Sequence, residues 1–226
     1  MCSQLFVPYD SLVDSCQFID SLEIPSLTLT VDGGSVHLYF AVIQAPIPVS
    51  GLNAAFSLLS QPEQLRYHSF EDYYQGISFL LGRQLARYGI SRLLGCSSRS
   101  VSIELHPLTG KPLTPHTYFN LSRSGPFIAC AVSANHNLGI DIEVINTDVD
   151  IALLNSYLSN IFSSTDIDWD DQILSHHSFY NQWTRVESQL KLSGVGLSDL
   201  HSSAIDFSIY QLNFANPFLT GSLCLS

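Results

Sequence analysis

The chain has 226 residues, of which 46% are hydrophobic and 13% are charged, and this composition excludes intrinsic disorder and collagen-like sequence. A chain of this length buries a sufficient core without a structural metal or a disulfide. Its formal net charge of −11 makes nucleic acid and anionic membrane surfaces unexpected partners, although all nine basic residues lie between positions 66 and 191.

The segment up to position 115 predicts one strand, then helices, then a short strand. β-Branched and aromatic residues mark the strand, and apolar residues at helical spacing mark two helices that break near Ser69. Gly89 is the expected C-cap of the second helix. The expected elements are a turn at 32–34, a strand at 36–43, two helices within 52–88, a short strand at 101–105 and a loop at 106–115.

The rest of the chain repeats a similar order. It predicts strands at 118–121, 127–133 and 138–144, a helix at 150–162, an acidic loop at 166–171, a helix at 178–192 and two strands within 204–225. The same tripeptide, His68-Ser69-Phe70 and His177-Ser178-Phe179, is expected to open the second helix of each half. The duplication predicts an α+β fold with two similar subdomains, residues 1–115 and 116–226. We expect each to be a small, mainly antiparallel sheet packed on helices, and a pseudo-twofold axis to relate them.

The five cysteines are far apart and form no C-x-x-C pair. An odd, unclustered set is typical of reduced thiols in a cytosolic compartment. The first twenty residues carry Asp10 and Asp14 where a secretion signal would be apolar. No apolar stretch is long enough to span a membrane, so we expect a cytoplasmic protein.

Asp141 and Glu143 are the sharpest local feature. Residues two apart in a strand point to the same face, so both carboxylates project together, with Ile140 and Ile142 on the other face. Two adjacent carboxylates repel unless a cation neutralises them, and Mg²⁺ is usually held by one or two carboxylates together with substrate phosphates. The alternative is a solvated edge strand of alternating polarity.

Glu187 precedes Lys191 by four residues on a predicted helix. At this spacing the two side chains either form a surface ion pair or, on a partly buried helix, supply a third metal ligand and a phosphate-binding ammonium. Two further turns, around Lys111 and Arg123, offer cations, hydroxyls and backbone N–H groups that suit phosphate oxygens. A purely structural role is the alternative for each turn.

Several other chemistries are excluded by missing motifs. The histidines have no metal-ligand spacing, and the sequence has no G-x-S-x-G, no Walker loop and no G-x-G-x-x-G. Nucleophilic triads, P-loop hydrolysis and dinucleotide-linked redox chemistry are therefore not expected.

Four segments together resemble a known family. In chain order they are Gly110-Lys111-Pro112, residues 119–125, residues 139–143 and residues 179–197, the last with a helix and two glycines. This succession resembles the phosphopantetheinyl transferase family, in its larger, pseudo-dimeric class that acts on acyl and peptidyl carrier proteins. The resemblance extends over roughly positions 50–200.

The resemblance implies that coenzyme A binds in a cleft between the two halves, with Mg²⁺ as cofactor. A serine of an apo acyl or peptidyl carrier protein would receive the 4′-phosphopantetheine arm, and 3′,5′-ADP would leave. It implies catalytic roles for Glu187 and Lys191. The implied metal ligands are Asp141, Glu143 and Glu187, and the implied coenzyme A contacts are Arg66, Lys111, Pro112, Ser122 and Arg123. Because one chain supplies both walls of the cleft, a monomer is sufficient.

Three positions depart from the family pattern. Arg123 stands where histidine is usual, Val186 where lysine is usual, and Gln75 where a basic residue is often found. With fewer cations for the phosphates, three consequences are open: coenzyme A binds more weakly, Arg83 or Arg185 replaces the missing charge, or activity is lost. The alternatives to an active transferase are a weakened homologue that binds coenzyme A or a carrier protein without transfer, and a Mg²⁺-dependent phosphohydrolase that uses the same three acids.

Overall fold

The computed structural model describes residues 3–8, 12–14, 24, 26–44, 47, 49–107, 111–158, 172–194 and 207–226. Some sequence features therefore lie outside the described residues: Cys2, Cys16, Gly110, the acidic segment 166–171 and Gly196. Within the described part, no helix is long and apolar enough to cross a membrane.

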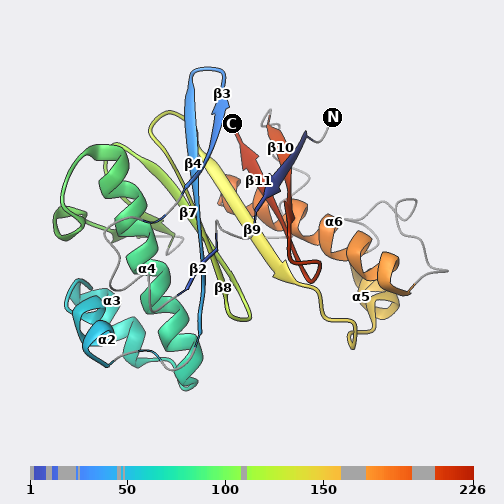
Figure 1. The fold of residues 1–226 in the computed structure, drawn as a ribbon, viewed down its shortest axis with the longest axis horizontal. Coiled ribbons are helices and arrows are strands. Elements are labelled where there is room, and N and C mark those ends of the chain that lie inside the picture. Colours follow the sequence, from blue (N-terminus) through green and yellow to red (C-terminus); the bar gives the residue numbers. More distant parts are fainter. Residues whose placement is uncertain are drawn as a thin grey trace.

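The described strands form two main sheets and one small pair (Figure 1). The first sheet has the order β2–β4–β8–β7, with β3 added beside β4, and the second has the order β1–β10–β11–β9. The first contains β2 (Leu12–Asp14), β3 (Leu27–Val31), β4 (Gly34–Val42), β7 (Tyr118–Ser124) and β8 (Phe127–Ser133). The second contains β1 (Ser3–Val7), β9 (Leu138–Val144), β10 (Ser208–Phe214) and β11 (Leu219–Leu225). The small pair is β5 (Glu104–Leu105) with β6 (Pro112–Leu113). Pairing is antiparallel except for β1 with β10 and β2 with β4.

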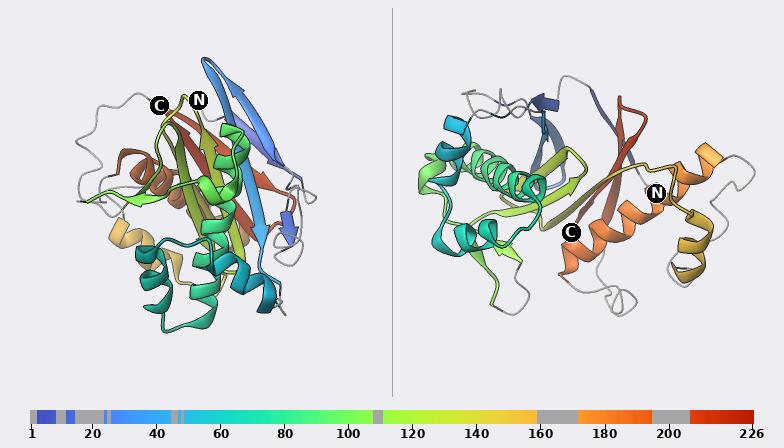
Figure 2. Two further views of the ribbon diagram at one scale, coloured as in Figure 1. Left: turned by 90° about the vertical axis from the view of Figure 1, so that its left-hand side faces the viewer. Right: turned by 90° about the horizontal axis from the view of Figure 1, so that it is seen from below.

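Helices cover the outer faces of the two main sheets. They are α2 (Val49–Phe56), α3 (Gln61–His68), α4 (Tyr73–Leu94), α5 (Ile151–Leu158) and α6 (Gln172–Ser193), with a short 3₁₀ turn, η2, at Ser98–Ser100. Helix α4 lies beside the first sheet and α6 beside the second (Figures 1 and 2). The two sheets bury a shared apolar layer that includes Leu38, Phe40, Ile140, Ile142 and Leu223. The resulting order of layers is helix, sheet, sheet, helix, and it confirms the predicted α+β class with mainly antiparallel sheets.

The same connectivity occurs twice. In the first sheet, β4 leads through helices to β7 and β8, and β8 pairs with both β4 and β7. In the second sheet, β9 leads through helices to β10 and β11, and β11 pairs with both β9 and β10. A pseudo-twofold axis and a boundary at 115/116 stay predictions, and the pairing of β4 with β8 crosses that boundary.

The expected helix boundaries need three corrections. The first helical segment contains three helices, because Ser60 and Glu63 form a capping box that starts α3. Helix α4 passes through Gly89 and ends at Leu94, with Gly95 as the C-cap at φ +66°. Gly89 has a packing role instead, because a Cβ at this position would lie only 2.9 Å from the Tyr39 ring. The shared tripeptide does not open corresponding helices: His68 ends α3, whereas residues 177–179 lie inside α6.

Other boundaries shift less. The strand expected at 101–105 is reduced to β5, and residues 112–113 of the expected loop form β6. Helix α6 begins six residues before the expected position 178, at Gln172. Strand β9 and the two final strands agree with the prediction because their apolar alternation is regular.

Candidate functional site

Helix α6 lies unusually close to strand β9, and this approach builds the site. A Cβ at Gly139 would lie 2.0 Å from the carbonyl oxygen of Ser188 and 2.5 Å from the backbone nitrogen of Leu192. Only glycine fits there without displacing the helix. Helix residues 187 and 191 are thereby held beside the carboxylates of β9.

Asp141 is a buried carboxylate, and its environment excludes the solvated edge strand as an account of this residue. Its side chain is 4% exposed. Oδ1 accepts hydrogen bonds from Lys191 Nζ at 2.6 Å and from Ser122 Oγ at 2.8 Å. Oδ2 is buried and has no hydrogen-bond partner. An unpartnered carboxylate oxygen in such a place is costly unless a cation or donor approaches it.

Alternate side chains of β7 attach this strand to the free edge of β9. Ser122 Oγ accepts a hydrogen bond from Ile142 N at 3.2 Å, and Ser124 Oγ accepts one from Val144 N at 2.9 Å. Ser124 also donates to Glu143 Oε2 at 2.5 Å, as Ser122 does to Asp141. Each serine therefore orients one carboxylate while satisfying the backbone of the next residue. Asn120 extends the series by accepting from the backbone of the residue at position 140.

The three acids expected at the site influence one another electrostatically. Burial raises the pKa of Asp141, while the charge and hydrogen bond of Lys191 oppose that shift. Burial also raises the pKa of Glu187, and the negative charge of Asp141 raises it further. For Glu143, burial is again the largest cause of a raised pKa, and Asp141 adds to it. The single ammonium group of Lys191 thus faces three nearby carboxylates, so the site carries an excess of negative charge.

Lys191 and Lys111 are joined through the end of α6. Lys191 forms its ion pair with Asp141, at 2.6 Å. The surface ion pair with Glu187, which was one of the two expectations, does not form. Lys111 Nζ donates to the backbone oxygen of Lys191 at 2.7 Å. A cation at a helix C-terminus is favourable because carbonyl groups there carry partial negative charge.

The opposite face of β7 lines a pocket that is rich in arginine. Because strand side chains alternate, Leu121 and Arg123 point away from Ser122 and towards α3 and α4. A pocket of about 320 Å³ is lined by three arginines, Arg66, Arg83 and Arg123, by one acid, Glu63, and by Pro112 and apolar residues. A second hollow, of about 570 Å³, shares Arg123 and includes Gln75 and Ser78. The predicted coenzyme A contacts thus fall on two faces of one edge strand.

Strand β9 provides carboxylate oxygens, which are the ligands that a hard divalent cation prefers. Asp141 offers a buried oxygen without a partner, Glu143 shares its face, and the excess negative charge favours a bound cation. Among the residues that the structure describes, however, no three His, Cys, Asp or Glu side chains are close enough together to hold a metal. A three-carboxylate site stays a prediction.

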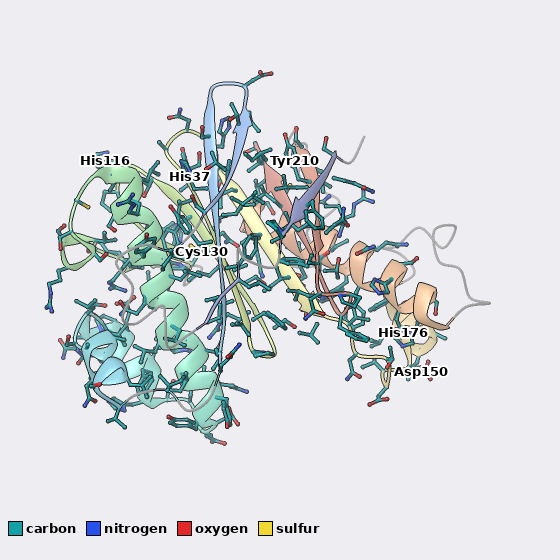
Figure 3. The ribbon with its side chains drawn as sticks, viewed as in Figure 1. His37, His116, Cys130, Asp150, His176 and Tyr210 are labelled. Atoms are coloured by element: carbon teal, nitrogen blue, oxygen red, sulfur yellow. The ribbon has the colours of Figure 1, made fainter. Side chains whose placement is uncertain are left out.

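The histidines labelled in Figure 3 are not among the residues of this site. His37 on β4 and His116 just before β7 lie at one end of the first sheet, whereas His176 lies far from both, on α6 (Figure 3). Cys130, also labelled there, is fully buried in the core between α4 and the first sheet.

Comparison with known proteins finds several transferases that are similar in sequence to this chain. No family model matches the chain. The 4′-phosphopantetheinyl transferase of Bacillus subtilis is 31% identical over 154 residues, which cover 64% of this chain and 63% of that protein. The transferase HetI of Nostoc sp. strain PCC 7120 is 28% identical over 192 residues, 80% of this chain and 77% of HetI. The transferase gsp of Aneurinibacillus migulanus is 28% identical over 169 residues, 72% of this chain and 67% of that protein.

The chain is similar to these 4′-phosphopantetheinyl transferases, which are enzymes. Two of its departures from the family pattern have a clear structural setting. Val186 is buried in an apolar cluster with Ile151 and Phe179, so this position packs α6 against α5. Gln75 is exposed in the first turn of α4 and lines the larger hollow.

The sequence named Arg83 only as a possible compensation, did not indicate Glu63, and placed the Ser124 hydroxyl in a phosphate-binding turn, whereas Ser124 lies on β7 and donates to Glu143. The period-two placement of Asn120, Ser122 and Ser124 on one strand is the signal that identifies the serine contacts. The burial of Arg83 depends on how α3 packs on α4, which no local pattern reveals.

Proposed function

We propose that this protein transfers the 4′-phosphopantetheine arm of coenzyme A to a serine of an apo acyl or peptidyl carrier protein. The serine oxygen forms a bond to the phosphorus on the pantetheine side, the bond from that phosphorus to the bridging diphosphate oxygen breaks, and 3′,5′-ADP leaves. The observation that carries the proposal is the Lys191–Asp141–Ser122 cluster, which lies across β7 from an arginine-lined pocket.

Lys191 and the arginine pocket lie on opposite faces of β7, and coenzyme A has phosphate groups at two separate places. Coenzyme A carries a diphosphate near its middle and a third phosphate on its ribose. A molecule that crosses the edge of β7 brings its diphosphate to the ammonium of Lys191 and its nucleotide end to the arginine pocket. The ammonium of Lys191 with its carboxylates on one face of β7 and the arginines on the other face offer two separate places for phosphate groups. Such an arrangement favours coenzyme A over a simple phosphomonoester.

Lys191 and Glu187 would carry the chemistry on the protein side. The side chain of Lys191 is 28% exposed, so we expect its ammonium to contact a diphosphate oxygen while keeping its bond to Asp141. Positive charge placed there stabilises the charge that develops on the leaving group. The raised pKa of Glu187 makes this carboxylate a better acceptor for the serine proton.

Asp141, Glu143 and Glu187 would hold Mg²⁺. When bound, the ion would supply Lewis-acid stabilisation of the diphosphate oxygens. Metal binding can be tested without turnover by titrating the protein with Mn²⁺ and following the free ion by electron paramagnetic resonance. We expect Asp141→Asn to weaken binding, and unchanged binding in that variant would contradict the assignment.

The cellular setting follows from the same proposal. The carrier protein and coenzyme A are the proposed partners, and one chain supplies every residue named above, so a monomer is sufficient. We place the enzyme in the cytoplasm, an assignment that the free thiols of Cys96, Cys130 and Cys224 support.

The decisive test uses mass spectrometry of the carrier. The protein is incubated with coenzyme A, Mg²⁺ and an apo carrier protein, and a mass gain of one phosphopantetheine is expected. Glu187→Gln should lose most of this activity, whereas Glu71→Gln, which changes an exposed acid between α3 and α4, should retain it.

The other outcomes separate the alternatives. Binding of coenzyme A without a mass gain would indicate a weakened homologue. Breakdown of coenzyme A without carrier modification would indicate a phosphohydrolase. Full turnover in Glu187→Gln would remove this residue from the mechanism.

A further inference from the structure

Arg83 is a buried arginine with an unsatisfied end. The residue is 7% exposed and lies in the middle of α4. Its Nε lies 3.2 Å from Glu63 Oε1 and its guanidinium carbon lies 5.1 Å from the centre of the Phe79 ring, but neither Nε nor Nη1 has a hydrogen-bond partner. The side chain also lines the pocket of about 320 Å³. A guanidinium that is buried and only partly satisfied is costly, so its persistence points to a ligand.

The charges around Arg83 do not balance. Glu63 already receives two hydrogen bonds from Arg87, at 2.6 and 3.3 Å, and is the partner of both arginines. One carboxylate therefore faces two buried guanidinium groups, and Arg66 and Arg123 add positive charge at the pocket. Burial lowers the pKa of Arg83 to about 10, and the charges of Arg87 and Arg123 contribute to this shift while Glu63 opposes it. An anion in the pocket would relieve the excess.

The pocket also has apolar walls, to which Phe70, Phe79, Leu105 and Leu121 contribute. Apolar surroundings lower the local dielectric constant, and charge-assisted hydrogen bonds are stronger there than in bulk water.

We propose that Arg83 binds a phosphate of the nucleotide end of coenzyme A through its guanidinium group, as the buried member of a cluster with Arg66 and Arg123. The inference rests on the proposed function and adds a binding residue to it.

Calorimetric titration with 3′,5′-ADP tests the contact. Arg83→Met removes the charge and keeps much of the volume, and we expect its affinity for 3′,5′-ADP to fall by about 10- to 100-fold. Binding of adenosine, which has no phosphate, should change little. The matched control is Arg92→Met, which alters an exposed arginine on the same helix and should bind 3′,5′-ADP as the wild type does. Arg83→Lys should recover part of the loss.

A second measurement remains if Arg83→Met does not fold. Nitrogen-15 NMR of the wild-type guanidinium groups, with the Arg83 signal assigned by its absence from Arg83→Lys, should show a shift on addition of 3′,5′-ADP but not of adenosine. An Arg83 signal that does not respond would overturn the proposal, as would wild-type affinity in Arg83→Met.

The wild-type controls separate this inference from the proposed function. If the wild type modifies the carrier while Arg83→Met binds 3′,5′-ADP normally, only the role of Arg83 falls. If the wild type neither binds coenzyme A nor modifies a carrier, both proposals fall.

Discussion

Lys191 Nζ lies 2.6 Å from Asp141 Oδ1 and 3.0 Å from Ser122 Oγ, so a single ammonium group joins helix α6 to strands β9 and β7. The carboxylate is almost fully buried, whereas the lysine retains some contact with solvent. Such an ion pair neutralises an otherwise isolated buried charge, and it holds the end of α6 over the candidate site.

We expect Lys191→Met to lower stability as well as activity, because it leaves Asp141 buried without a counter-charge. The loss should be smaller than the about 3–5 kcal/mol of a fully buried pair, since the lysine is partly exposed. Urea unfolding measures the change. Lys191→Arg keeps the charge and should retain most of the stability; equal midpoints for Lys191→Met and the wild type would show that the pair contributes nothing.

Gly139→Ala should be strongly destabilising, because its Cβ would lie 2.0 Å from a backbone oxygen of α6. Either the helix moves off β9 and the acids separate from Lys191, or the chain does not fold. Gly76→Ala is the matched control: its Cβ would meet nothing closer than 3.6 Å inside α4. Replacing a helix-interior glycine there should stabilise the protein by about 0.5–1 kcal/mol. Thermal unfolding of both variants checks the contrast, and a stable, active Gly139→Ala would refute the close approach.

The part of the fold that local patterns determine was predictable. Strand β9 and the last two strands follow from regular alternation, and that alternation also places Asp141 and Glu143 together on one face. The close approach of Lys191 to these acids required the resemblance as well, because it depends on how α6 packs against the second sheet.

Features created by distant contacts were not predictable from local patterns. Strand β1 pairs with β10, and nothing in residues 3–7 indicates a partner near the other end of the chain. Gly89 looks like a helix terminator but is a contact point for Tyr39. Arg83 has the sequence context of a surface helix residue, and only the packing of α3 on α4 buries it.

The hydroxyl contacts between β7 and β9 predict graded effects of serine removal. Ser122→Ala leaves Ile142 N without an acceptor and removes one donor from Asp141, at a buried position, so a loss of about 1–3 kcal/mol is expected. Ser124→Ala should cost less, because Ser124 and Glu143 are only half-buried. Ser193→Ala serves as control, since that hydroxyl donates only to carbonyl groups within its own helix. Chemical denaturation ranks the variants, and a Ser122→Ala as stable as Ser193→Ala would contradict the role of the contact.

Glu63 predicts a specific dependence of stability on pH. Burial alone would raise the pKa of Glu63, but hydrogen bonds from Arg87 and Ser60 and the charges of Arg87 and Arg83 lower it below the ordinary value of 4.5. Because the folded-state pKa is depressed, the stabilisation from this group is present above pH 4.5 and is lost as the pH falls through the folded-state pKa. Glu63→Gln should therefore be less stable than the wild type at neutral pH, by about 3–5 kcal/mol, because two buried arginines lose their partner. The difference should narrow below pH 4.5, where the wild type also loses the charge. Unfolding measured across this range, with Glu71→Gln as an exposed control, tests the assignment; a difference that stays constant with pH would mean that the Glu63 charge is not what stabilises the pair.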